Sequence, residues 1–238
     1  MFYRLDFDFA SDTVMEYQRI VAPGEGHRNR AQNVQPEIAG VLDKCNNLKN
    51  TIVRLRFNFG VSTRYGTGFF VNLPSPTHDV ILTAAHNLID EKKILATNMT
   101  VIYGDNDEES ATEFRICPTY IKYLETDPKS DDRGIYDYGV ILLAKCPSSE
   151  PERQRMMQNM RQGMGLSLGI YYNDTLRDSK DVRVSGYDEK GGDSPIQSSG
   201  PLVRVGDQLE YLAPTEPGMS GSAVWVPYGG QPMVVGIQ

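Results

Sequence analysis

The chain has 238 residues, a length that allows one or two domains with a sizeable core. It carries 24 Lys and Arg against 31 Asp and Glu, and this net charge of −7 disfavours nucleic acid and anionic membranes as partners. No apolar run approaches the roughly 20 residues of a membrane-spanning helix, and residues 1–12 alternate apolar with charged side chains, unlike a secretory signal. We therefore expect a cytoplasmic protein that binds neither nucleic acid nor membrane.

The cysteines and the densest acidic stretch indicate no metal site. The cysteines, Cys45, Cys117 and Cys146, are odd in number and lack C-x-x-C spacing, so neither a disulfide framework nor a zinc site is predicted. Residues 105–109 are rich in carboxylates but lack the mid-loop glycine and the terminal glutamate of a calcium loop. We expect reduced, mostly buried thiols and a solvated acidic turn.

The strand-like segments fall into two groups in chain order. Residues 1–50 form an extension, with a strand near its start, that is expected to belong to neither group. In residues 51–146, short β-branched and aromatic runs separated by turn clusters predict strands at 51–57, 68–71, 80–83, 99–103, 113–117 and 138–144. This spacing favours an antiparallel barrel.

The second group resembles the first in its strand content. Residues 147–163 contain charges, Gln and Met but no β-branched residue, which predicts a helical linker. In residues 164–238 strands are predicted at 166–172, 181–187, 202–205, 208–213, 222–226 and 233–237. The organisation is therefore an all-β chain of two barrels, 51–146 and 164–238, joined by a linker.

One of the three histidines lies where a catalytic base could be held. His86 follows the apolar strand 80–83 and the pair Ala84-Ala85, so a rigid strand would present it at the start of a helical turn. His27 and His78 lie in Gly- and Pro-rich turns and are expected to be solvated loop residues.

A serine and an aspartate complete the candidate chemistry. Ser220 lies between Gly218 and Gly221, just before the apolar strand 222–226, where a tight turn would expose its hydroxyl and leave amide groups unpaired. Asp137 enters an apolar strand, and a carboxylate there needs a partner such as an imidazole N–H. Asp131 and Asp132, in a polar loop, are alternatives for the same role.

Four segments together resemble the ordered signatures of trypsin-like, chymotrypsin-fold serine proteases. They are Gly-Thr-Gly-Phe-Phe-Val at 66–71, Ile-Leu-Thr-Ala-Ala-His at 81–86, Asp137 before Val-Ile-Leu, and Gly-Met-Ser-Gly-Ser at 218–222. The short serine motif is closer to the glutamyl endopeptidase and HtrA-like branches than to digestive trypsins. The resemblance covers residues 51–238 and implies a chymotrypsin-like fold of two antiparallel six-stranded-type β-barrels.

The resemblance also implies a role for each candidate residue. Ser220 would attack the scissile carbonyl of a peptide or protein substrate, His86 would transfer its proton, and Asp137 would orient His86. The backbone amides of Gly218 and Ser220 would form the oxyanion hole. This chemistry requires no cofactor and no metal.

Several positions depart from the pattern of trypsins. Met219 replaces the aspartate that binds a newly formed N-terminus, so activation by such a switch is not expected. Asn87 replaces the cysteine of a trypsin disulfide, in agreement with a reducing compartment. Thr215 and Gln238 fall in the substrate-binding positions of glutamyl endopeptidases, where Gln238 replaces a histidine, whereas Pro214 replaces the basic-residue-binding aspartate. The uncharged Thr215 and Gln238 could hydrogen-bond a polar substrate side chain, the missing histidine weakens the case for Glu, and selection of Arg or Lys is not expected.

The end of the sequence leaves two alternatives to an autonomous enzyme. The family continues beyond the strand that ends near Gln238, so the second barrel is expected to be truncated, and a partner chain or further domain could complete it. The alternatives are an inactive, peptide-binding protease scaffold and the protease module of a larger regulatory protein.

Overall fold

The computed structural model describes most of the two strand-rich regions. The described residues are 7–8, 13–14, 43–44, 48–73, 77–104, 107–111, 113–123, 135–144, 165–169, 176, 181–192, 194–205 and 208–238. The predicted helical linker at 147–163 lies outside them, as do His27, Cys45, Cys146, Asp131 and Asp132.

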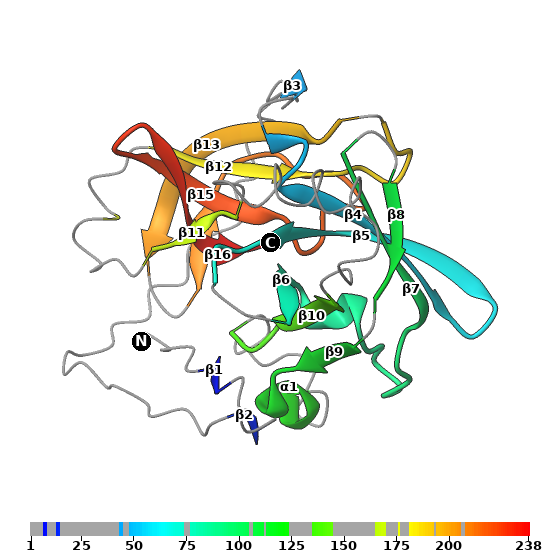
Figure 1. Ribbon diagram of the computed structural model, residues 1–238. Coiled ribbons are helices and arrows are strands. Elements are labelled where there is room, and N and C mark those ends of the chain that lie inside the picture. Colours follow the sequence, from blue (N-terminus) through cyan, green and yellow to red (C-terminus); the bar gives the residue numbers. More distant parts are fainter. Residues whose placement is uncertain are drawn as a thin grey trace.

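The first sheet is built from consecutive antiparallel strands. They are β4 (Ile52–Phe59), β5 (Ser62–Phe70), β6 (His78–Thr83), β7 (Thr97–Tyr103), β8 (Asp107–Ser110), β9 (Glu113–Ile116) and β10 (Gly139–Ala144). Their spatial order is β8-β7-β4-β5-β6-β10-β9. The edge strands β8 and β9 are separated by two residues in the chain, so the sheet curls to bring its edges together (Figure 1).

The second sheet has the order β11-β16-β15-β12-β13-β14. Its strands are β11 (Ser167–Leu168), β12 (Asp181–Gly186), β13 (Ile196–Val205), β14 (Leu209–Tyr211), β15 (Ala223–Tyr228) and β16 (Gln231–Ile237). The β11–β16 pair is parallel and the other pairs on this path are antiparallel.

One segment of the N-terminal extension pairs with the second sheet, contrary to the expectation that it belongs to neither half. β3 (Asp43–Lys44) pairs antiparallel with the first residues of β13, with Lys44 opposite Ile196. This pairing satisfies backbone groups that β13 would otherwise expose. Elsewhere in the extension, β1 (Phe7–Asp8) pairs with β2 (Thr13–Val14).

Helical structure is limited in the described part of the chain. It includes a 3₁₀ turn, η2 (Ala85–Asn87), and a short helix, α1 (Pro118–Tyr123). Among the described residues no helix is both long and apolar enough to cross a membrane.

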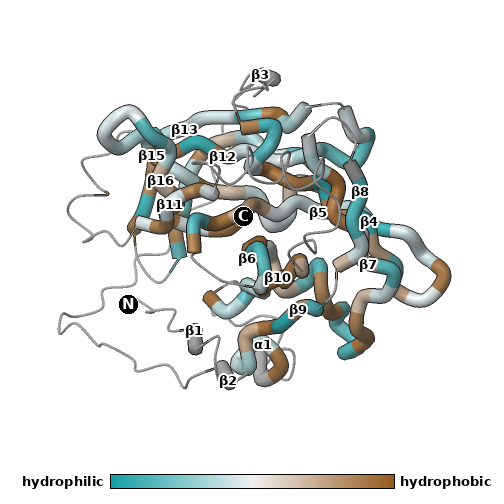
Figure 2. The backbone as a smooth tube through the Cα atoms, viewed as in Figure 1, coloured by the Kyte–Doolittle hydropathy of each residue, from teal (hydrophilic) through white to brown (hydrophobic). Residues whose placement is uncertain are grey.

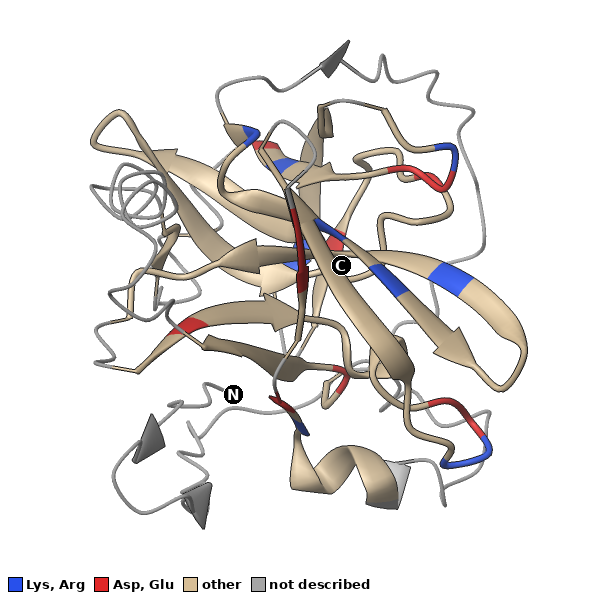
Figure 3. Ribbon diagram, turned by 45° about the vertical axis from the view of Figure 1, so that its right-hand side comes forward, with Lys and Arg blue, Asp and Glu red and all other residues tan. Residues whose placement is uncertain are grey.

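Strand alternation sorts side chains between the barrel interior and solvent. In β4, Val53, Leu55 and Phe57 are buried in the first-barrel core, whereas Arg54 and Arg56 are partly exposed. Hydrophobic and hydrophilic residues accordingly follow one another along the backbone, in brown and teal in Figure 2. Acidic and basic residues are interspersed over the described elements (Figure 3).

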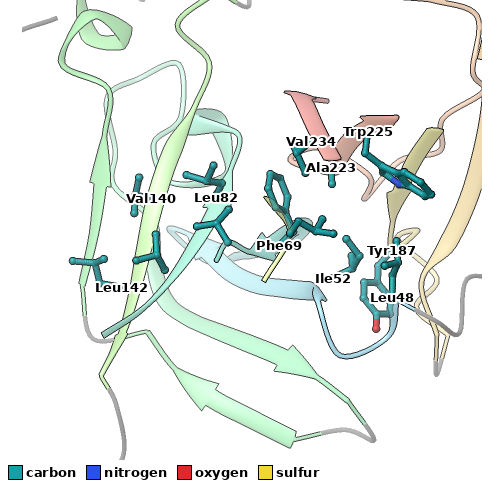
Figure 4. Packing of buried hydrophobic residues seen from close by; sticks show 13 residues of the cluster. Leu48, Ile52, Phe69, Leu82, Val140, Leu142, Tyr187, Ala223, Trp225 and Val234 are labelled. Carbon is teal, nitrogen blue, oxygen red and sulfur yellow. The ribbon is translucent and has the colours of Figure 1, made fainter. Parts of the chain in front are cut away.

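A shared core joins the two sheets. Ile52, Phe69 and Leu82 of the first sheet belong to the same buried cluster as Ala223 and Trp225 of the second (Figure 4). Each sheet also has its own core. The candidate site residues of the two halves are therefore held relative to one another by continuous apolar packing.

Candidate active site

Two of the candidate residues lie at the same end of a strand pair. β6 and β10 are antiparallel, with Thr83 opposite Gly139. His86 lies three residues after the end of β6, in η2, and Asp137 lies two residues before the start of β10. The pairing register of the sheet therefore brings together residues that are 51 positions apart in the sequence.

The carboxylate of Asp137 binds His86 at two points. The distance from His86 Nδ1 to Asp137 Oδ2 is 2.6 Å, and the His86 backbone N–H donates to Asp137 Oδ1 at 2.9 Å. An ionised carboxylate only accepts hydrogen bonds, so this contact places the ring proton on Nδ1 and leaves a lone pair on Nε2. The His86 side chain remains 42% exposed, and a neutral imidazole in this tautomer can accept a proton from an incoming group.

An apolar layer supports the histidine turn. Ala85 and Ile89 pack with Cys117 and Tyr120 in a small buried cluster. Cys117 is a free, buried thiol. This packing fixes the backbone on both sides of His86, while the His86 side chain stays accessible.

The turn that carries Ser220 depends on glycines in the left-handed region. Gly218 has φ +95° and Gly221 has φ +88°. A Cβ atom on Gly221 would lie 2.2 Å from the carbonyl oxygen of Thr67 and 2.3 Å from Thr83 Oγ1. Both positions favour glycine for conformation, and Gly221 also requires it for the close approach of the first sheet, whereas a Cβ on Gly218 would lie 2.5 Å from the backbone nitrogen of Glu189.

The serine turn is tied to the first sheet by hydrogen bonds. The Thr67 N–H donates to the Ser220 carbonyl at 2.8 Å, and Thr67 Oγ1 donates to the Gly218 carbonyl at 2.9 Å. The Asn87 side chain, next to His86 in the chain, donates to the same Ser220 carbonyl at 2.9 Å. The histidine turn and the serine turn are therefore directly bonded across the boundary between the two sheets.

Two backbone amides in the turn have no backbone acceptor. Within the described part of the chain, neither the Gly218 nor the Ser220 N–H donates to another backbone group. Their neighbours are paired: the Met219 N–H donates to Glu216 O at 3.1 Å and the Ser222 N–H to Met219 O at 2.9 Å. Unpaired amides beside a serine are suited to binding a developing oxyanion.

Met219, between Gly218 and Ser220, is fully buried in the core of the second sheet. Its position is where trypsins place an ion-pairing aspartate, and here it is packed as an apolar residue.

The expected substrate-binding residues flank this turn. Thr215 and Gln238 are exposed, and the backbone of Gln238 exchanges hydrogen bonds with the turn: the Gly221 N–H donates to its carbonyl and its N–H donates to Ser222 O. The Tyr211 hydroxyl donates to Gln238 Oε1. Burial raises the pKa of Tyr211 to about 12, so this phenol keeps its proton at physiological pH.

Of the other two histidines, the structure describes His78, which does not join the site. His78 begins β6, at the opposite end of that strand from His86, and its Nδ1 lies 2.8 Å from Thr77 Oγ1. His27 lies outside the described residues, as do the alternative carboxylates Asp131 and Asp132.

Sequence reasoning missed the residues that hold the site together. Thr67, Thr83 and the side-chain role of Asn87 were not predicted, nor was Tyr211 as the partner of Gln238. One signal was available: Thr67 lies between two glycines inside a strand, a pattern typical of close backbone approach.

Comparisons with known proteins bear on the fold. No protein-family model and no curated protein matches this sequence. Among solved structures, the protease Anisep from Arthrobacter nicotinovorans aligns over 80% of this chain and 83% of its own, with a TM-score of 0.57 and 14% identity. The thermostable serine protease AL20 from an extremophilic microorganism aligns over 77% and 81%, with a TM-score of 0.55 and 13% identity.

The chain has the fold of trypsin-like serine proteases. The expected all-β, chymotrypsin-like architecture is thereby confirmed. The scabies mite inactivated protease paralogue S-I1 is also similar, over 82% of this chain and 85% of its own, with a TM-score of 0.50 and 14% identity.

Proposed function

We propose that this protein is a serine endopeptidase whose catalytic residues are His86, Asp137 and Ser220. In the first step Ser220 Oγ attacks the scissile carbonyl carbon while its proton passes to His86 Nε2. The C–N bond then breaks, the proton moves from His86 to the leaving amine, and the acyl group remains on Ser220. Water, deprotonated by the same imidazole, attacks the acyl-enzyme and releases the carboxylic acid and free Ser220.

The observation that carries this proposal is the bidentate contact between Asp137 and His86. A carboxylate 2.6 Å from Nδ1 selects the tautomer that a general base needs and stabilises the imidazolium formed when the base takes a proton. The unpaired amides of Gly218 and Ser220 supply the expected electrostatic stabilisation of the tetrahedral intermediate.

The main alternative is an inactive scaffold that binds peptides. Fold alone does not separate the two functions, because the scabies mite paralogue described as inactivated shares the fold. The presence of all three catalytic residue types, and of the His86–Asp137 contact, favours the enzyme.

The residues beside the serine support a preference for an uncharged polar residue before the cleaved bond. The Tyr211 hydroxyl donates to Gln238 Oε1 and so orients the carboxamide, whose NH₂ group is left as a donor. Thr215 adds an exposed hydroxyl. Neutral donors suit a carboxamide such as that of Gln better than a carboxylate, which would be desolvated without a cation, and they offer no counter-charge to Arg or Lys.

We further propose that the protein works in a reducing compartment such as the cytoplasm. The buried, free thiol of Cys117 supports this location, since disulfides are rare there.

Labelling with a fluorophosphonate probe tests the enzyme against the scaffold. Wild type and the matched variant Ser199→Ala, at an exposed strand position, should be labelled, whereas Ser220→Ala should not. Equal labelling of Ser220→Ala, or an unlabelled wild type that is folded, would contradict the catalytic proposal. Peptides that vary only in the residue before the cleaved bond (Gln, Glu, Ala and Arg) then measure the preference as kcat/KM.

A further inference from the structure

The side chain of Asn87 occupies the boundary between the two sheets. Only 2% of Asn87 is exposed. Its Nδ2 donates to Ser220 O at 2.9 Å and to Thr83 Oγ1 at 3.0 Å, so both N–H groups of the amide are used. A buried carboxamide is costly unless it is bonded, and here it is bonded to the backbone of the proposed nucleophile.

The space for this amide is provided by Gly66. A Cβ atom at residue 66 would lie 2.6 Å from Asn87 Nδ2 and 2.7 Å from its Cγ and Oδ1, closer than side-chain atoms approach. Any side chain at this position would displace the carboxamide from its hydrogen bonds. Gly66, in β5, and Asn87, in η2, therefore form a complementary pair.

The hydrogen bonds of this region restrict the backbone on both sides of Ser220. The Ser220 carbonyl accepts from the Thr67 N–H at 2.8 Å and from Asn87, while the preceding carbonyl, of Met219, accepts from the Ser222 N–H at 2.9 Å. Fixing both peptide planes fixes φ and ψ of Ser220, and so the direction of its Cα–Cβ bond. Asn87 is also the last residue of η2, directly after His86.

We propose that Asn87 is a positioning residue that holds the nucleophile at a fixed distance from its general base. The inference rests on the proposed function, since it concerns the geometry of Ser220 and His86. Asn87 touches neither substrate nor the reacting atoms; it acts by joining the backbone of Ser220 to the turn that carries His86. A displacement of about 1 Å between reacting groups costs up to about 100-fold in rate.

Three variants separate this role from simple packing. Asn87→Leu keeps the size of the side chain but removes both donors. Gly66→Ala leaves Asn87 in place but pushes its amide away. The double variant Gly66→Ala/Asn87→Ser gives the new methyl group room and restores a hydroxyl donor. Asn72→Leu, at an exposed position of the same half, is the control.

The first readout is the kinetics of Ser220 phosphonylation, resolved into a limiting rate constant and a half-saturating probe concentration. We expect Asn87→Leu and Gly66→Ala to lower the limiting rate constant at least tenfold with less than a threefold change in the half-saturating concentration. The double variant should react faster than Gly66→Ala alone, and Asn72→Leu should stay within twofold of wild type. Folded Asn87→Leu reacting at the wild-type rate, or losses that only follow the unfolded fraction measured by thermal melting, would overturn the proposal.

The second readout needs no catalysis. Amide hydrogen exchange at Gly221 and Ser222 should become at least tenfold faster in Asn87→Leu, whereas exchange in β12 should not change, because only the serine turn loses an anchor. Unchanged exchange at both amides would refute the role of Asn87 whether or not the enzyme is active. A wild type that the probe does not label would contradict the proposed protease function but not the anchoring role of Asn87, because amide exchange tests that role without catalysis.

Discussion

Replacing Asp137 by asparagine tests which ring nitrogen of His86 carries the proton, with almost no change in the shape of the site. The Asn Oδ1 atom can still accept from the His86 backbone N–H, but its NH₂ group would face Nδ1, which now lies 2.6 Å from a carboxylate oxygen. An NH₂ group only donates, so Nδ1 must become the acceptor and the ring proton must move to Nε2. The imidazole would then be unable to take the Ser220 proton.

The size of the effect distinguishes this reasoning from a loss of orientation alone. A charge-assisted hydrogen bond is worth about 1.5 to 3 kcal/mol, so losing only that bond would slow the reaction by roughly 10- to 150-fold. Loss of the correct tautomer takes the decrease in kcat to about 10⁴-fold, equivalent to about 5.5 kcal/mol.

The assay is steady-state hydrolysis of a peptide substrate, with Asp181→Asn, at an exposed strand position, as the matched control. A folded Asp137→Asn variant that retains more than a tenth of wild-type kcat would refute the role of Asp137. In that case Asp131 and Asp132 would be the next positions to substitute.

Three further changes give distinct results. Gly221→Ala should cut serine labelling at least 100-fold, because the new Cβ would lie 2.2 Å from a carbonyl oxygen at φ +88°, whereas Gly229→Ala, whose Cβ meets nothing within 4 Å, should leave it unchanged. Tyr211→Phe should free the Gln238 amide to rotate and so lower the ratio of kcat/KM for a substrate with Gln before the cleaved bond to kcat/KM for the matching substrate with Ala. Because burial raises the Tyr211 pKa to about 12, the wild-type ratio should be constant from pH 7 to about pH 10, and a ratio lost by pH 9 would contradict this role of Tyr211. Trp225→Phe removes an indole N–H bonded at 2.9 Å to the buried Ser185 hydroxyl and also removes packing volume from the shared core, so calorimetry should show a Tm lower by at least roughly 2 to 4 °C, and an unchanged Tm would argue against that bond.

The strand content and the histidine–aspartate neighbourhood could be predicted because their signals are local. His86 and Asp137 each adjoin an apolar strand, and a carboxylate beside such a strand needs a partner. Once β6 and β10 pair, with Thr83 opposite Gly139, the contact follows from register.

The bonds across the sheet boundary could not be predicted in this way. Asn87 and Ser220 are 133 residues apart, and nothing beside Asn87 in the sequence indicates a carbonyl acceptor from the other half. The pairing of β3 with β13 escaped prediction for a related reason, since a two-residue strand has too few side chains to show alternation.

The core cluster shared by the two sheets has a consequence for biosynthesis. His86 and Asp137 leave the ribosome before Ser220, and the carbonyl of Ser220 finds its donors only when the second sheet docks on Ile52, Phe69 and Leu82. At about 5 to 20 residues per second, the 134 residues from His86 to Ser220 take roughly 7 to 27 s to synthesise. During that interval a nascent chain carries the proposed base and its orienting carboxylate but no aligned nucleophile, so the proposed proteolytic activity would begin only once the second sheet has docked.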